Sequence, residues 1–221
     1  MNVVYNVDCL EYMKTLPDKC FDLAVVDPPY GIGASNYARG GTQYGTQKAV
    51  CKVYEIKDWD NSAPSKEYFD ELMRVSKNQI IFGANHFISR IPYDSSCWIV
   101  WDKENGDNMY ADCELAWTSF DRAVRMCRYR WAGMLQGNMK EKEERIHPTQ
   151  KPVALYDWIY RNFAKEGDKI LDTHLGSGSS RIAAYKANLD FVGCEIDKDY
   201  FETQEKRFTD FTNQISLFDI L

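Results

Sequence analysis

An acid, two prolines and a tyrosine follow a short apolar run in VVDPPYGIG, residues 25–33. We expect the apolar run to be a buried strand, because strands covered on both faces lose the alternation of polar and apolar side chains. Asp27 then lies at the carboxyl end of that strand. Pro28 and Pro29 lack backbone N–H groups and cannot continue a sheet, so their carbonyl groups stay free to accept hydrogen bonds. With Tyr30, this corner offers a ligand a carboxylate, free carbonyls and an aromatic ring; a simple strand-ending turn is the alternative.

A glycine loop supplies a second chemical signal, in KILDTHLGSGSSRIAAYKANLDFVGCEID, residues 169–197. We expect one strand to end at Asp172, Gly176 and Gly178 to follow, and the next strand to end at Glu195. Glycines let a ligand approach the backbone, and an acid after the next strand can accept hydrogen bonds from both ribose hydroxyls. This pattern predicts a nucleoside pocket, the alternative being a tight strand–helix turn. Pyrophosphate ligands usually need a third glycine where this chain has Ser-Ser-Arg, which favours S-adenosylmethionine over a dinucleotide.

Alternating strands and helices must position these two motifs. The expected strands cover residues 2–7, 21–27, 79–82, 97–101, 114–119, 169–172 and 191–195. The expected helices cover residues 10–15, 66–75, 153–164, 179–187 and 198–208, the second of them capped by Ser65. Such alternation predicts an α/β fold with a doubly wound, mostly parallel sheet, in which ligands collect at the carboxyl ends of the strands.

Length and composition predict one globular domain over residues 1–221, with insertions at 35–57 and 121–146 and a tail at 209–221. The seven cysteines form no CxxC pair, so we expect reduced thiols, no metal site and a cytoplasmic location. No signal-like start and no apolar run long enough to span a bilayer are seen, which argues against membrane insertion. The net charge of −6 does not favour nucleic-acid binding as a whole, although charge can be local.

Together the two motifs resemble a known family. DPPY with an Asp-x-x-x-Gly-x-Gly loop is similar to the amino-methylating DNA methyltransferases, which transfer a methyl group from S-adenosylmethionine to an exocyclic base nitrogen. The order, with DPPY first and the glycine loop last, is that of the beta class, whose sheet is a circular permutation of the common methyltransferase arrangement. The resemblance extends over VDCLEYMKTLPDKCFDLAVVDPPYGIG, IIFGANHF, WIVWDK, DCELAWTSF and HPTQKPVAL, and its middle segments look like those of small phage and prophage adenine methylases.

The resemblance implies a catalytic role for Asp27, Pro28, Pro29 and Tyr30. An exocyclic amine is a poor nucleophile because its lone pair is delocalised into the ring. Asp27 would accept one N–H of that amine and the Pro28 carbonyl the other, while Tyr30 stacks on a base flipped out of the duplex. Preorganised acceptors that face developing positive charge then supply much of the catalysis, together with alignment of the amine and the methyl group.

The resemblance also implies a set of cofactor contacts for S-adenosylmethionine. Asp8 and the Cys9 backbone would lie by its adenine, Glu195 by its ribose, and Lys151 near its amino-acid end. For Asp8 a helix N-cap is the alternative, and for Lys151 a solvated position at a helix start. The full predicted set is Asp8, Cys9, Asp27, Lys151, Asp172, His174, Gly176, Ser177, Gly178, Ser179 and Glu195.

One departure from the family pattern lies in the glycine loop. Beta-class enzymes usually show Asp-Pro-Phe there, whereas this chain has Asp172-Thr173-His174. Losing the proline is expected to loosen the loop, and His174 replaces an apolar wall with a titratable ring. We therefore expect altered cofactor affinity with an intact catalytic corner.

DNA contacts are expected from the two insertions, because they break the alternation of strands and helices and carry basic side chains. Arginines can read guanine edges or hold phosphates. Since this region is short, we expect a short or loosely specified site on double-stranded DNA, with a homodimer extending the contact. The candidate contacts are Arg39, Lys48, Arg122, Arg125, Arg128 and Arg130.

The end of the chain carries a separate hypothesis. Gln214, Leu217 and Phe218 are similar in spacing to the short peptides by which bacterial proteins bind the replication sliding clamp. A flexible segment could seat Leu217 and Phe218 in an apolar groove while Gln214 forms hydrogen bonds beside it. The alternative is a segment that folds back on the core.

These patterns lead to one main functional prediction: a site-specific methyltransferase that acts on N6 of adenine in DNA, in restriction–modification or a phage. The nearest alternative is cytosine-N4 methylation, which uses the same corner, often with serine in place of the aspartate. A catalytically silent subunit that binds DNA or cofactor is the alternative from another class. A dinucleotide oxidoreductase would not need the DPPY corner.

Overall fold

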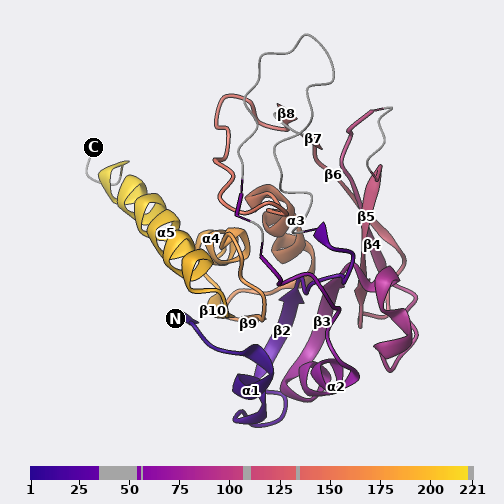
Figure 1. Cartoon of the computed structure of the whole chain (residues 1–221). Helices are drawn as coiled ribbons and strands as arrows, with labels where there is room; N and C mark the ends of the chain where they lie inside the picture. Colours follow the sequence, from indigo (N-terminus) through magenta and orange to yellow (C-terminus); the bar gives the residue numbers. More distant parts are fainter. Residues whose placement is uncertain (35–53, 56, 107–110, 133–134, 219–221) are drawn as a thin grey trace.

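The computed structural model describes residues 1–34, 54–55, 57–106, 111–132 and 135–218, with side chains as far as residue 214. Figure 1 shows a central sheet with helices on both sides. The strands are β1 (Asn2–Tyr5), β2 (Phe21–Val26), β3 (Ser76–Phe82), β4 (Trp98–Asp102), β5 (Cys113–Thr118), β6 (Arg125–Arg128), β7 (Trp131–Ala132), β8 (Leu135–Gln136), β9 (Lys169–Asp172) and β10 (Asp190–Cys194). The helices are α1 (Cys9–Lys14), α2 (Lys66–Val75), α3 (Val153–Phe163), α4 (Ser179–Lys186) and α5 (Lys198–Phe218), with short 3₁₀ turns η2 (Ala84–His86) and η3 (Ile88–Arg90).

The main sheet has the strand order β1-β10-β9-β2-β3-β5-β4-β6. From β1 to β3 all neighbouring strands are parallel, and only β5 runs against its neighbours. The predicted doubly wound, mostly parallel sheet is therefore confirmed. The carboxyl ends of β1, β10, β9 and β2 meet at one edge of the sheet. Asp8, Glu195, Asp172 and Asp27, each at or just after one of these ends, are thus brought to the same edge.

Two hydrophobic cores cover the two faces of the sheet. On one face, α2 packs Phe69 and Leu72 against side chains that include Val26 of β2. On the other face, α3 packs Leu155 against side chains that include Val25. Because successive residues of a strand point to opposite faces, adjacent valines of β2 enter different cores. This arrangement explains the nearly continuous apolar run of β2 and fixes the direction in which the chain leaves the sheet at Asp27.

Two segments differ from the sequence-based expectations. The insertion at 121–146 is not wholly separate from the sheet, because β6 joins it as the edge strand beside β4. The last helix does not end near residue 208, and the predicted tail at 209–221 was wrong as far as Phe218, where α5 ends. The ring of Tyr185 on α4 meets those of Phe208 and Phe211 edge-on, at 5.5 and 6.3 Å. These contacts continue the apolar face of α5 past the expected end.

No helix in the described ranges is long and apolar enough to cross a membrane. Most of the predicted insertion at 35–57 lies outside the described residues.

Candidate active site

The DPPY corner lies directly after β2, as the sequence predicts. The Tyr30 hydroxyl donates a 2.8 Å hydrogen bond to Oδ1 of Asp27, and the Tyr30 ring stacks on His86 with centroids 5.1 Å apart. Beyond the corner, the backbone N–H of Gly31 donates to the carboxylate of Asp60, a buried acid, at 2.8 Å. No sequence motif marks Asp60, whose carboxylate fixes the loop after Tyr30 and so helps to orient the tyrosine.

Lys151 joins this corner to β5. Its Nζ lies 2.5 Å from Oδ2 of Asp27 and 3.1 Å from Oε2 of Glu114, and only 5% of its side chain is exposed. Lys103 lies 2.6 Å from the other oxygen of Glu114. Two carboxylates thus face two ammonium groups in a partly buried cluster, Asp27–Lys151–Glu114–Lys103, whose formal charges cancel. The predicted alternative of a solvated Lys151 is wrong, and Glu114 was not singled out from the sequence.

Burial and charge shift the titration of this cluster. Burial raises the pKa of Asp27, and the nearby Lys151 opposes that rise. For Glu114, burial is outweighed by Lys151 and Lys103, which hold its pKa at about 2. Burial raises the pKa of Tyr30 well above its usual value, so its hydroxyl stays protonated near neutral pH. Tyr30 is therefore a hydrogen-bond donor to Asp27 and not a base.

Next to the corner lies a pocket at the carboxyl ends of the parallel strands. It brings together most of the predicted cofactor residues, namely Asp8, Cys9, Asp27, Lys151, His174, Gly176, Ser177, Ser179 and Glu195. The other two lie behind its wall. Asp172 accepts hydrogen bonds from the His174 N–H and from the Ser180 hydroxyl. Gly178 has a φ of +71°, and a Cβ there would lie 3.1 Å from Gln204 of α5, so this glycine also permits the close approach of a helix.

Glu195 lies at the pocket wall as a preorganised acceptor. Its Oε2 accepts a 2.8 Å hydrogen bond from the Gly176 N–H, and its Oε1 accepts one of 2.9 Å from the Asp197 N–H. Burial raises the pKa of Glu195, while these backbone donors oppose the rise. The glycine loop and the acid after the next strand are therefore hydrogen-bonded to each other, as required if both contact one nucleoside.

Asp8 serves as a helix cap. Its Oδ1 accepts hydrogen bonds from the backbone N–H groups of Leu10 at 2.8 Å and Glu11 at 3.0 Å, which satisfies two free donors of the first turn of α1. Asp8 also lines the pocket. The two roles that the sequence left open are compatible, because the capping fixes the carboxylate beside the pocket.

A hydrogen-bonded chain holds the unusual Thr173-His174 pair in place. The hydroxyls of Tyr68 and Thr173 are 2.6 Å apart, and the Thr173 hydroxyl is 2.9 Å from Nδ1 of His174. The Nε2 of His174 lies 3.9 Å from the Cys9 sulfur, and burial lowers the pKa of His174 to about 4. The expected loosening of the loop is thus offset by these bonds, and His174 is neutral near pH 7.

Four aromatic rings outside the predicted set also line the pocket, those of Trp59, His147, Tyr156 and Tyr200. The centroid of His147 lies 5.2 Å from that of Trp59 and 4.3 Å from that of Tyr200. Burial lowers the pKa of His147 to about 3, so this ring is neutral near pH 7. The HPTQKPVAL segment gave the signal for His147, whereas Trp59 and Tyr200 come from segments without a recognisable motif.

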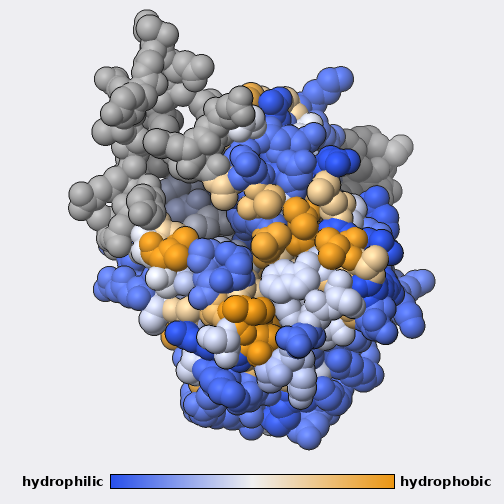
Figure 2. Space-filling model, turned by 90° about the vertical axis from the view of Figure 1, so that its right-hand side faces the viewer, coloured by the Kyte–Doolittle hydropathy of each residue, from blue (hydrophilic) through white to orange (hydrophobic). Residues whose placement is uncertain are grey.

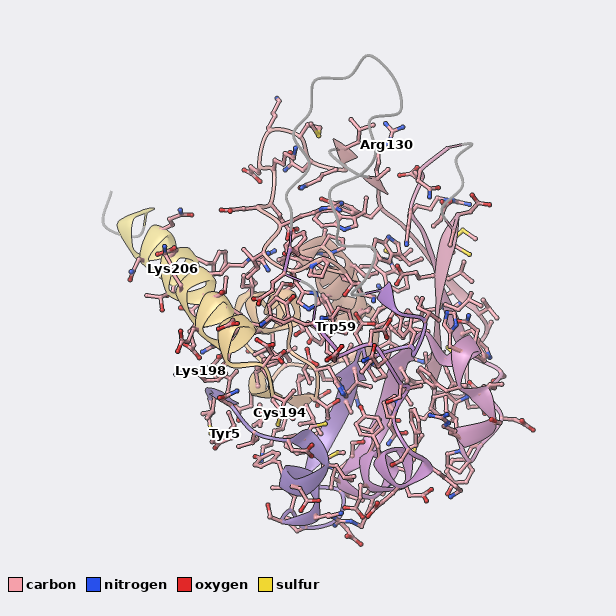
Figure 3. The ribbon with its side chains drawn as sticks, in the orientation of Figure 1. Tyr5, Trp59, Arg130, Cys194, Lys198 and Lys206 are labelled. Carbon is pink, nitrogen blue, oxygen red and sulfur yellow. The ribbon has the colours of Figure 1, made fainter. Side chains whose placement is uncertain are left out.

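The predicted DNA-contacting arginines near β6 lie toward opposite ends of this strand. Because β6 runs parallel to β4, Arg128 lies near the site edge of the sheet and Arg122 precedes the opposite end. Arg122 lies over the rings of Phe120 and Phe163 and donates to the Asn162 carbonyl. Figure 3 shows Arg130 beyond the strand ends, on the same side of the sheet as Trp59.

The remaining predicted residues take three different positions. Arg125 lies exposed on β6. Arg39 and Lys48 lie outside the described residues. Gln214 is exposed on α5, and Leu217 and Phe218 belong to its last turn, where the structure describes no side chains. In the part of the chain that is described, no cluster of three His, Cys, Asp or Glu side chains could hold a metal ion.

Comparisons with known proteins agree with this geometry. Residues 99–206 match the DNA methylase family model. The type II methyltransferase M.HpaI of Haemophilus parainfluenzae is 28% identical over 90% of this chain and 72% of its own length. M.HinfI of Haemophilus influenzae is 24% identical over 94% of this chain and 68% of its own length. The chain is thus similar to these two type II methyltransferases over at least 90% of its length.

Solved structures show the same fold. The putative DNA modification methylase TTHA0409 of Thermus thermophilus, in complex with S-adenosylmethionine, has a TM-score of 0.61 at 15% identity, covering 95% of this chain and 94% of its own. The M1.HpyAVI complex with S-adenosylmethionine has a TM-score of 0.56 at 20% identity, and the match covers 94% of this chain and 98% of the M1.HpyAVI chain. The cytosine-N4-specific PvuII DNA methyltransferase has a TM-score of 0.59 at 12% identity, and the match covers 97% of this chain and 93% of the PvuII chain. The fold is that of the S-adenosylmethionine-dependent methyltransferases.

Proposed function

We propose that this protein methylates N6 of adenine in double-stranded DNA, with S-adenosylmethionine as the methyl donor. The observation that carries the proposal is the position of Asp27. Its carboxylate lies in the wall of the same pocket as Glu195 and the glycine loop. A base amine on Asp27 and a nucleoside cofactor on Glu195 would therefore be neighbours.

The pocket fits the cofactor through the chemistry of its lining. Glu195 presents an anchored carboxylate to the two ribose hydroxyls, and Asp8 and Cys9 lie where an adenine ring would be placed by the resemblance. The lining holds four carboxylates and the ammonium group of Lys151, which suits a ligand that carries a sulfonium and an ammonium group; the carboxylates are those of Asp8, Asp27, Glu195 and Asp197. When bound, S-adenosylmethionine supplies an electrophilic methyl group.

The chain's own residues prepare the amine. Asp27 and the Pro28 carbonyl accept its two N–H groups, which pulls the nitrogen toward tetrahedral geometry and directs its lone pair at the methyl group. Tyr30 stacks on the extruded base, since the amine cannot reach the pocket while the base is paired. Fixed acceptors facing the positive charge that develops on nitrogen stabilise the transition state. Once methylated, the amine is cationic and loses its proton readily to solvent or to Asp27.

The choice of adenine over cytosine rests on DPPY, because cytosine-N4 enzymes often carry serine at the position of Asp27. Cytosine-N4 methylation is the second candidate, since the PvuII enzyme shares the fold. A silent subunit that binds DNA or cofactor without turnover is the third. The proposal includes the beta-class strand order, in which β2 precedes β9 in the chain yet lies beside it in the sheet, and a phage-type or restriction–modification role in a bacterial cytoplasm.

The decisive experiment measures methyl transfer from labelled S-adenosylmethionine to unmethylated genomic DNA, followed by digestion to nucleosides. We expect N6-methyladenine from the wild type and none from Asp27→Ala. If the wild type instead produced N4-methylcytosine, the protein would be a cytosine-N4 methyltransferase and the adenine assignment would be wrong. Cofactor and DNA binding with no product from either protein would establish the silent subunit instead.

A sliding clamp is proposed as a partner of the chain's end. Because α5 continues to Phe218, Leu217 and Phe218 would have to leave the last helical turn to enter an extended binding groove. A pull-down with bacterial sliding clamp should capture the wild type and not the Leu217→Ala/Phe218→Ala double variant. Equal capture of both proteins would contradict this partner.

A second copy of the chain is proposed as the other partner. Figure 2 shows the side on which β4 and β5 lie in Figure 1, where apolar residues are gathered among hydrophilic ones. Val124 and Met126 around β6 and Ile88 of η3 are each about half exposed. Burying such side chains would stabilise a dimer. Sedimentation velocity should give a dimer for the wild type and a monomer for Met126→Lys; a wild-type monomer would contradict it.

A further inference from the structure

Both carboxylate oxygens of Asp27 already have partners. Oδ1 accepts from the Tyr30 hydroxyl at 2.8 Å, and Oδ2 lies 2.5 Å from Nζ of Lys151. Under the proposed function, Asp27 must instead accept an N–H of the base amine. Each carboxylate oxygen can accept two hydrogen bonds, so the amine either shares an oxygen with a resident donor or replaces that donor, and replacement is open only to a donor that can move.

Tyr30 is the less movable of the two donors. Its ring packs against Gly83, where a Cβ would lie only 2.0 Å from Cε1, and it also contacts Phe87 and stacks on His86. Moving the hydroxyl would require the ring to leave all three. Tyr30 is also the residue assigned to stack on the base, so its ring must keep its position.

Lys151 has a second carboxylate to bind. Besides Asp27, its Nζ lies 3.1 Å from Oε2 of Glu114 and 3.1 Å from the Tyr30 hydroxyl oxygen. These three oxygens surround the ammonium group: the Tyr30 hydroxyl accepts a hydrogen bond from it, and the two carboxylates form ion pairs with it. If Asp27 is taken by the base, Glu114 still keeps the buried ammonium paired, and an unpaired charge at this depth would be strongly disfavoured.

We infer that Lys151 is a positioning residue, the displaceable counter-ion of Asp27, and that Glu114 retains Lys151 when the base amine replaces it on Asp27. This inference rests on the proposed function of the corner. Lys103, 2.6 Å from the opposite oxygen of Glu114, keeps that carboxylate anionic and in place. The exchange needs no covalent step: one N–H donor leaves Oδ2 of Asp27 and another takes the same oxygen.

In the resting protein the lysine also favours the ionised form of Asp27, since its charge opposes the rise in pKa that burial causes. The charged or titratable groups around Asp27 are Lys151 from the segment before α3, Glu114 from β5, Tyr30 from its own loop, Tyr156 from α3 and Asp172 from β9. Lys151 is the only cation in this set of described groups. Without it, burial and the two other carboxylates would all favour the protonated form of Asp27, which has lost part of its capacity to accept the amine.

Two substitutions should lower the activity with different pH dependences. In Glu114→Gln, Lys151 keeps Asp27 as its only carboxylate partner and competes with the base, so kcat/KM for DNA should fall at least about tenfold at every pH. In Lys151→Met, Asp27 loses its counter-ion, so activity should be lost near neutral pH and recover as the pH is raised. Lys151→Arg should restore much of the neutral activity.

Matched controls separate these effects from a loss of folding. Glu71→Gln removes a glutamate that is ion-paired and 20% exposed, compared with 22% for Glu114, but lies on α2. Lys186→Met removes the ion pair of α4 with Asp157. Neither residue lines the pocket, and both variants should keep the wild-type pH profile.

A measurement without DNA keeps this inference distinguishable from the proposed function. ¹³C NMR of labelled aspartate carboxyls, with the Asp27 signal assigned by Asp27→Asn, should show Asp27 titrating at higher pH in Lys151→Met than in the wild type. An active wild type with an unchanged Asp27 titration would overturn the inference alone. An inactive wild type with a shifted titration would overturn the proposed function and leave Lys151 as the counter-ion.

Cofactor affinity decides between this role and a direct contact of Lys151 with the cofactor. Isothermal titration with S-adenosylhomocysteine should give affinities for Lys151→Met and Glu114→Gln close to that of the wild type. Loss of more than about tenfold in affinity for Lys151→Met, with an unchanged pH profile, would assign the lysine to the cofactor and overturn the inference.

Discussion

The ring of Tyr30 lies so close to Gly83 that a Cβ on this glycine would be 2.0 Å from Cε1 of the ring. Gly83 also has a φ of +65°, which side chains rarely adopt. Gly83→Ala should therefore push Tyr30 off Asp27 and His86. Because a shift of about 1 Å in a positioning group can cost roughly a hundredfold in rate, we expect kcat of methyl transfer to fall by about ten- to a hundredfold.

Gly167 provides the matched control for this prediction. Its φ is +80°, but nothing lies within 4 Å of a Cβ built on it. Gly167→Ala therefore carries the backbone strain without the clash, and it should lower the melting temperature while kcat stays near the wild-type value. Equal losses of kcat in the two variants would show that strain, and not the position of Tyr30, is responsible.

The fold follows from local patterns that the sequence displays directly. Helix α2 spans Lys66–Val75 with Ser65 as its cap, as expected, because the cap and the apolar spacing are both local signals. The buried strand before Asp27 was recognisable from its nearly continuous apolar residues. The end of α5 was not predictable in this way, because the contacts of Phe208 and Phe211 with Tyr185 depend on how α4 and α5 pack.

The site was predictable where one motif contains the chemistry and not where distant segments meet. Asp27, Glu195 and the glycine loop follow parallel strands, so the topology alone brings them together. Glu114 lies near the start of an ordinary-looking strand, and its contact with Lys151 depends on the reversed direction of β5, which places the start of this strand at the site edge of the sheet. Asp60 and Tyr200 likewise acquire their roles only through tertiary contacts.

The Thr173 hydroxyl should stabilise the folded protein through its two hydrogen-bond partners. It bridges the buried hydroxyl of Tyr68 and the ring of His174, and Thr173→Val leaves both without this partner. An unsatisfied buried polar group costs about 1–3 kcal/mol, so the free energy of unfolding should drop by that amount. Urea denaturation measures it, and Thr173→Ser, which keeps the hydroxyl, should recover most of the loss. A valine variant as stable as the wild type would show that water or another group replaces the bridge.

Alanine substitutions at the two ends of the arginine-rich segment should have different effects. Arg130 lies on the site side of the sheet, so Arg130→Ala should weaken binding to a DNA duplex and reduce the slope of log K against log salt by about one. Fluorescence anisotropy at several salt concentrations measures both quantities. Arg122 packs on Phe120 and Phe163, so Arg122→Ala should lower stability by about 1 kcal/mol and leave the salt slope unchanged. A reduced slope in the Arg122 variant would instead extend the DNA interface to the far end of β6.

Asp172 should make the stability of the protein depend on pH. Burial raises its pKa from 3.8 to about 7, and the donors Ser180 and His174 offset this only in part. Since the unfolded chain has the ordinary pKa, the folded state binds one extra proton between these values, and this carboxyl destabilises the fold increasingly as pH rises through that window.

Asp172→Asn removes this carboxyl charge while its amide oxygen can still accept hydrogen bonds. The variant should therefore match the wild type or fall slightly below it at pH 5, and exceed it at pH 8 by about 2–4 kcal/mol in the free energy of unfolding. Denaturation in urea at both pH values checks the sign. The same variant should bind S-adenosylmethionine more weakly, because the cofactor's positive groups lose a carboxylate beside the pocket. A stability difference that does not change with pH would mean that Asp172 is ionised in the folded protein across the whole range.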